Sequence, residues 1–142
     1  MSDSERYIDN QDETITDKET GLIWAKEDSW LKEKRWVSWD EAAEYAHHLN
    51  DLALGGYNSW HLPNIEEGTS IIWKEAANKD KYGNDIKLNP IFPEGPQARM
   101  WLHEPMSGSE SHFIDLTTGE LDTKYKSVAG RMAARPVVNP KK

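Results

Sequence analysis

The side chains best suited to catalysis are His103 and Glu104, with His112 on the following predicted strand. If these strands are neighbours, two imidazoles and a carboxylate converge, a donor set that binds zinc and similar metals. The five histidines nevertheless show no ligand spacing within any one element, and the chain has neither a Gly-x-Ser-x-Gly motif nor a cysteine. We therefore predict a protein that is not an enzyme and needs no cofactor, and keep a metal-dependent enzyme built on these three residues as an alternative.

More residues are suited to ligand binding than to catalysis, and most of them lie in the predicted loops. The segments 78–97 and 103–111 combine aromatic, amide and charged side chains, a mixture that stacks on and hydrogen-bonds to sugars or peptides. An earlier loop carries Trp30 and Trp36 among charged residues, and tryptophan is enriched at protein interfaces. The predicted ligand-binding residues are Trp30, Trp36, Tyr82, Asn84, Asp85, Arg99, His103, Glu104 and His112.

Composition restricts the class of partner. The 142 residues suffice for one domain, and 17 Lys+Arg against 25 Asp+Glu give a net charge of -8. This charge disfavours nucleic acid and anionic membrane surfaces, because their phosphates would be repelled. No apolar run is long enough to cross a bilayer, so membrane insertion is not expected. The cysteine-free composition and polar N-terminus favour a cytoplasmic location, with a secreted or cell-surface location as the alternative if the chain is cut from a longer protein.

Cap and turn signals predict the elements that position these side chains. Ser38 and Glu41 form a capping box ahead of a helix that runs out near 50–54, and Asn64 with Glu67 form a similar box ahead of a second helix reaching Ala76. Between them, the segment 55–64 forms a corner that includes a very short strand at 60–62. Residues 78–97 are predicted to be a long irregular loop. Strands are predicted over 6–8, 14–16, 22–25, 99–103, 111–116, 121–125 and 131–138.

The order of these motifs resembles the Lcl C-terminal-domain family, which is named for a collagen-like bacterial adhesin. The resemblance covers about residues 6–138, and its most specific part is the corner ending in Trp-x-Leu-Pro-Asn. It rests on the motifs Asp9-Asn10, Thr14-Ile15-Thr16-Asp17, Thr20-Gly21-Leu22-Ile23-Trp24, Trp39-Asp40-Glu41-Ala42, Gly56-Tyr57-Asn58-Ser59-Trp60-His61-Leu62-Pro63-Asn64, Trp101 with His103-Glu104-Pro105, and Asp115-Leu116 before Gly119.

This resemblance implies an α+β, C-type-lectin-like fold: two helices packed on a small twisted antiparallel sheet, long loops, and termini side by side. It implies one domain over 6–138, between a disordered tail at 1–5 and a second tail at 139–142. Family members are mostly binding or adhesion modules. We therefore predict a non-enzymatic module for protein–protein interaction or assembly, of unknown oligomeric state, with a carbohydrate-binding, adhesin-like domain as the first alternative.

Three departures from the family pattern bear on this prediction. Positions where members carry a disulfide are matched by Ala46 and Ala133, which fits a reducing compartment. Members have Asp and Arg around the corner tryptophan where this chain has Ser59 and His61, which puts the usual ion pair at the corner in question. The calcium-binding triplets of sugar-binding C-type lectins are missing, so a protein partner is favoured over a sugar and calcium is only a disfavoured cofactor.

Overall fold

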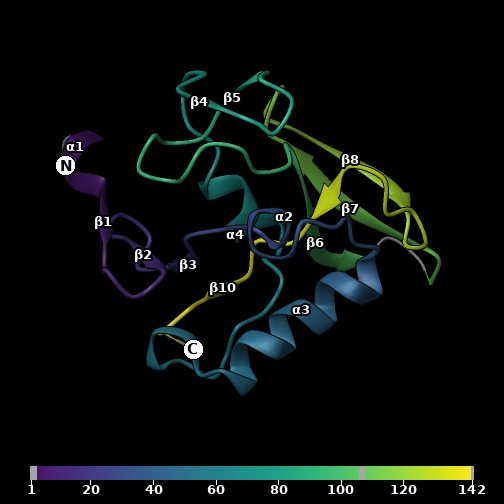
Figure 1. Ribbon diagram of the computed structural model, residues 1–142, viewed down its shortest axis with the longest axis horizontal. Helices are drawn as coiled ribbons and strands as arrows, with labels where there is room; N and C mark the ends of the chain where they lie inside the picture. Colours follow the sequence, from purple (N-terminus) through teal and green to yellow (C-terminus); the bar gives the residue numbers. More distant parts are fainter. Residues whose placement is uncertain (1–2, 106–107, 142) are drawn as a thin grey trace.

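The computed structural model describes residues 3–105 and 108–141, with side chains for 5–103 and 108–141. The arrangement is α+β, as predicted (Figure 1). The helices are α1 (Asp3–Arg6), α2 (Ser29–Glu33), α3 (Trp39–Asp51), the 3-10 turn η1 (Leu54–Gly56) and α4 (Ile65–Ser70). The strands are β1 (Tyr7–Asp9), β2 (Thr14–Asp17), β3 (Ile23–Ala25), β4 (Asn78–Lys79), β5 (Asp85–Ile86), β6 (Arg99–Pro105), β7 (Glu110–Asp115), β8 (Glu120–Tyr125), β9 (Met132–Ala133) and β10 (Val137–Val138).

Two four-stranded sheets carry the fold. The first has the order β1-β2-β3-β10, so the first and last strands of the chain share a sheet, and the second has the order β8-β7-β6-β9. All pairings are antiparallel except that of β6 with β9, which run parallel. The segment 78–97 contains the two-residue strands β4 and β5, which form a small hairpin rather than continuous loop. In Figure 1 this hairpin and α3 lie at opposite edges of the molecule.

Helix α3 begins and ends close to where the sequence predicts. The Ser38 hydroxyl accepts a hydrogen bond from the Glu41 backbone N–H while the Glu41 carboxylate accepts one from the Ser38 N–H, which completes the capping box. The buried stripe of the helix consists of Ala42, Tyr45, Ala46 and Leu49.

Helix α4 is shorter than predicted. Its capping box of Asn64 and Glu67 is present, but the helix ends at Ser70 instead of continuing to Ala76. The Thr69 and Ser70 hydroxyls donate to backbone carbonyls within the helix, and the Trp73 N–H donates to the carbonyl of Lys87. The chain leaves the helix because side-chain and tertiary hydrogen bonds replace the next helical ones.

The corner around Trp60 is built by hydrogen bonds rather than by a strand. The Asn50 side chain brackets Trp60, accepting from its backbone N–H at 2.6 Å and donating to its carbonyl at 3.0 Å. The predicted strand at 60–62 is reduced to one bridge between His61 and Val137. His61 Nε2 lies 3.1 and 3.2 Å from the two carboxylate oxygens of Glu67, so a histidine–glutamate pair forms at this corner.

The core divides between the two faces of the second sheet. On one face Met100, Leu102 and Ile114 pack with residues of the first sheet, and on the other Trp101 and Phe113 pack against α3. Gly68 of α4 faces the first of these faces, where an added Cβ would stand 2.6 Å from the Leu102 side chain. The glycine therefore permits close packing of helix on sheet, and this outweighs its low helix propensity.

Candidate ligand-binding site

Two tryptophans predicted to bind a ligand stack on each other. The rings of Trp30, in α2, and Trp36 have centroids 6.5 Å apart and planes inclined by 28°. Trp36 is 46% exposed, whereas Trp30 is half-buried and its indole N–H has no hydrogen-bond partner among the described residues. Lys34 adopts a left-handed conformation between them (φ 57°), and its backbone N–H donates to the Trp30 carbonyl. Because the turn is closed in this way, Trp36 is presented on the surface instead of being folded into the core.

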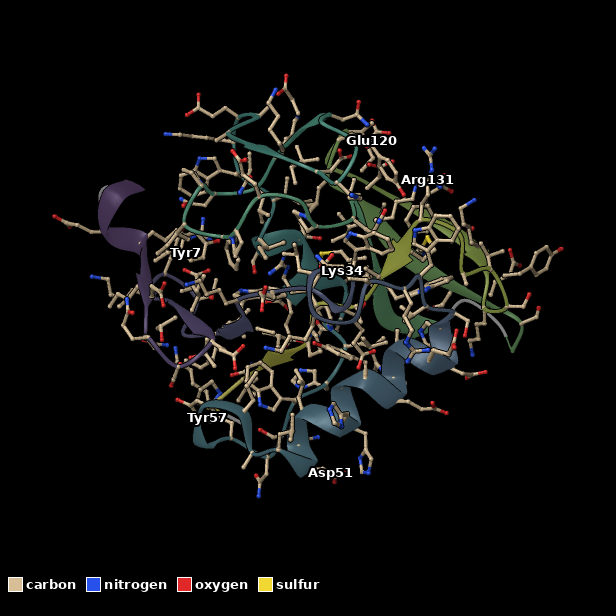
Figure 2. The ribbon with its side chains drawn as sticks, viewed as in Figure 1. Tyr7, Lys34, Asp51, Tyr57, Glu120 and Arg131 are labelled. Carbon is tan, nitrogen blue, oxygen red and sulfur yellow. The ribbon has the colours of Figure 1, made fainter. Side chains whose placement is uncertain are left out.

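Positive charge gathers beside this pair. The Lys81 ammonium lies 6.0 Å from the centre of the Trp30 ring, within cation–π range. Neither Lys34 nor Lys81 forms an ion pair with any residue that the structure describes. Both line an open groove of about 630 Å³ that also contains Trp30, Leu31, Lys79, Asp80, Gly83, Glu94 and Gly95. We call Trp30, Trp36, Lys34 and Lys81 the tryptophan surface; Figure 2 shows Lys34 near the centre of the view.

Three other predicted residues meet in a second, smaller hollow. Tyr82, Asn84 and Arg99 line a pocket of about 150 Å³, which we call the polar pocket. Its remaining lining residues are Asp80, Gln97, Ala98, Asp115, Thr117 and Arg131. Because Asp80 also lines the groove, the two hollows adjoin across the turn 80–84.

The turn 80–84 is held by Asp80. Its buried carboxylate accepts hydrogen bonds from the backbone N–H groups of Tyr82 and Asn84, at 2.8 and 2.9 Å. Tyr82 is thereby turned outwards, and the Arg131 guanidinium lies over its ring at 4.5 Å. Arg131 itself has a positive φ of 62°, a conformation that is uncommon for a residue with a side chain.

Gln97 is the least expected residue of the polar pocket. It is only 2% exposed, and neither its side-chain oxygen nor its side-chain nitrogen has a hydrogen-bond partner among the described residues. Leaving a buried polar group unpaired costs about 1–3 kcal/mol. An unpaired amide at the edge of a pocket is therefore a group that a ligand could satisfy.

Two buried residues of opposite charge, Asp28 and Arg135, lie near both hollows without a direct ion pair between them. Asp28 caps α2 by accepting from the Leu31 N–H at 2.8 Å, and its second oxygen accepts from the Gln97 N–H at 2.9 Å. Arg135, 1% exposed, donates from Nη1 to the carbonyls of Ala25 and Lys26. Burial raises the pKa of Asp28, and the Arg135 charge acts in the opposite direction. Burial lowers the pKa of Arg135, but a guanidinium remains charged at physiological pH.

The remaining predicted residues lie elsewhere or outside the described part. Asp85 is exposed and pairs with Lys79 across the β4–β5 hairpin. His103 is exposed on β6 and His112 is half-buried on the adjacent strand β7, while the Glu104 side chain lies outside the described residues. Within the described side chains, no group of three or more His, Asp or Glu residues is placed to hold a metal ion.

Several residues of the site carry no recognisable sequence signal. Lys34, Lys81 and Arg131 are charged residues of ordinary-looking loops, and Gln97 is placed by a partner 69 positions away. The one available signal was Asp80, because an aspartate two residues ahead of a Tyr-Gly-Asn segment is typical of a side-chain-capped turn.

Comparison with known proteins identifies a family. The family model for the Lcl C-terminal domain matches residues 13–138. No curated protein matches the chain. None of the helices described is both long enough and apolar enough to cross a membrane.

Proposed function

Since the chain belongs to the Lcl C-terminal domain family, we propose that it is a non-enzymatic binding module of C-type-lectin-like fold. Its ligand is an acidic segment of another protein, held on the tryptophan surface. The observation that carries the proposal is the stacked pair of Trp30 and exposed Trp36 beside two lysines without ion-pair partners among the described residues.

The exposed indole supplies the apolar part of the interface. Burying a tryptophan against a partner contributes more than burying most other side chains, and tryptophan is enriched at interface hot spots. Its stacking on half-buried Trp30 restrains the ring of Trp36 before binding. Less side-chain entropy is therefore lost when a partner packs on it.

The lysines select the charge of the partner. The protein as a whole carries a net charge of -8, which would repel an acidic ligand at long range. At physiological ionic strength, however, exposed charges are screened beyond about 8 Å, so the groups nearest the ligand dominate. Of the acidic residues lining the groove, Asp80 is buried and engaged with its own turn, which leaves Glu94 as the carboxylate facing the ligand.

A peptide selection tests the proposal and does not require the partner to be identified first. Random peptides are displayed and selected on the intact domain, and the same library is selected on the Lys81→Glu variant. We expect the wild type to enrich peptides that combine Asp or Glu with an aromatic or aliphatic residue. The variant is expected to lose this acidic preference, because a repulsive charge replaces an attractive one. Enrichment without acidic bias, or with the same bias on the variant, would refute the proposal.

A further inference from the structure

The polar pocket contains cationic groups whose hydrogen-bonding capacity is largely unused. The Arg131 side chain makes no hydrogen bond or ion pair with any described residue, and its guanidinium lies over the Tyr82 ring. The Arg99 guanidinium lies over the Phe113 ring, with Nε 3.6 Å from an Asp115 oxygen. Each guanidinium carries five N–H donors, so most donors on both arginines are available to a ligand.

The acidic residues of the pocket are already engaged. Asp80 accepts the two backbone hydrogen bonds that hold its turn. Asp115 accepts from both the backbone N–H and the hydroxyl of Thr117, through one carboxylate oxygen. The pocket therefore offers more unused donors than unused acceptors, which favours an anionic ligand. Carboxylates and phosphates both match the planar fork of an arginine.

Gln97 adds a different requirement. Its buried amide has an unpartnered donor and an unpartnered acceptor among the described residues, and the last torsion of a glutamine side chain rotates easily. Turning the amide towards the pocket lets it bind a group that is itself both donor and acceptor. A peptide amide has this property, whereas phosphate at neutral pH is chiefly an acceptor.

We propose that the polar pocket binds the free C-terminus of a polypeptide, with the terminal carboxylate on Arg99 and Arg131 and the last peptide amide on Gln97. The volume of about 150 Å³ corresponds to roughly five water molecules, enough for a chain end but not for a longer segment. The inference rests on the proposed function only in taking the ligand to be a polypeptide. Because the hollows share Asp80, the upstream part of such a chain can lie along the groove of the tryptophan surface.

The test is an NMR titration of the intact domain with a minimal chain end, N-acetylglycylglycine. A matched probe, its C-terminal amide, differs only in lacking the carboxylate, and inorganic phosphate tests for a general anion site. For a ligand of about a dozen heavy atoms we expect a dissociation constant of about 1 mM. We expect the acid to shift the backbone signals of 82–84 and 97–99 together with the Gln97 side-chain signals. The amide is expected to bind at least about tenfold more weakly.

Two variants separate the roles of the charge and the amide. Arg131→Gln removes the cation but keeps a residue of similar backbone preference, and should weaken the acid probe about tenfold. Gln97→Met removes the amide at nearly constant volume and should weaken the probe about threefold or more. Gln97→Met should also raise the melting temperature of the free domain, because an unpaired buried polar group is lost. Leu52→Ala, a change at an exposed residue at the end of α3, is the control and should bind like the wild type.

Each remaining outcome overturns the inference. No signal shift at about 10 mM probe, roughly ten times the expected dissociation constant, means that the pocket does not bind a chain end. Equal binding of the acid and the amide would show that the pocket does not recognise the carboxylate. Phosphate binding that is insensitive to Gln97→Met would identify a general anion site instead. Tighter binding of a neutral sugar such as glucose would indicate a carbohydrate site. If N-acetylglycylglycine does not bind but acidic peptides bind at Trp36, only this inference is refuted. If N-acetylglycylglycine binds but acidic peptides do not bind at Trp36, only the proposed function is refuted.

Discussion

Replacing Arg135 with Met should destabilise the domain strongly, although the side-chain volume barely changes. The guanidinium is fully buried and donates to the carbonyls of Ala25 and Lys26 at 3.0 and 2.6 Å. Its loss also leaves the buried Asp28 carboxylate without its counter-charge. Leaving a buried charge uncompensated costs about 3–5 kcal/mol. For a domain of this size, each kcal/mol lowers the melting temperature by about 2–4 °C, so we expect a fall of about 6–20 °C.

A double-mutant cycle in urea gives the coupling directly. Asp28→Asn keeps an oxygen for the α2 cap but replaces the acceptor of the Gln97 N–H with a donor, and it removes the negative charge that acts on Arg135. The double variant avoids an isolated buried charge, so its loss of unfolding free energy should fall short of the summed single losses by about 1–3 kcal/mol. A loss below about 1 kcal/mol for Arg135→Met, or additive losses, would show that the two buried charges do not stabilise each other.

Two further changes test the packing and the capping. Gly68→Ala should lower the unfolding free energy by about 1–2 kcal/mol despite better helix propensity, because its Cβ would meet fully buried Leu102 at 2.6 Å. The control Gly130→Ala has nothing within 4 Å of the added Cβ and should be neutral or slightly stabilising. Equal effects of the two substitutions on the unfolding free energy would contradict the close packing at Gly68. Hydrogen bonds from Ser38 lower the pKa of Glu41 below its ordinary value of 4.5, so this group adds stability above that pH and loses it as the pH falls through the folded-state pKa. Melting temperatures of Glu41→Gln should therefore decline less on acidification from about pH 5 to pH 3, whereas parallel curves would exclude this contribution.

Sequence patterns that involve residues close together in the chain predict local structure correctly. The capping boxes beginning at Ser38 and Asn64 depend on residues three apart, and the structure contains both. The predicted end of the second helix is wrong, because Ile71 and Trp73 continue an apolar pattern that fits a helix. The Trp73 N–H instead bonds to Lys87. The pattern predicts burial, which is correct, but not the backbone hydrogen bonds that a distant segment supplies.

The candidate site is predictable only in part, for the same reason. Tyr82 and Arg99 stand out by their chemistry, and the structure places both on the polar pocket. Gln97 and Arg131 do not, because their positions depend on a long-range hydrogen bond and on a left-handed backbone conformation. The pairing of His61 with Glu67 likewise depends on how the corner folds back onto α4.

Calorimetric titration determines whether the tryptophan surface binds an acidic segment. A peptide selected on the wild type is titrated into the wild type, Trp36→Ala and the exposed control Leu52→Ala. Trp36 is preferred to Trp30 as the site of substitution, because half-buried Trp30 also supports the fold. We expect Trp36→Ala to weaken binding about 30-fold, as for a hot-spot residue, and the control to bind like the wild type. Unchanged affinity in Trp36→Ala would show that the ligand does not bind at the tryptophan surface.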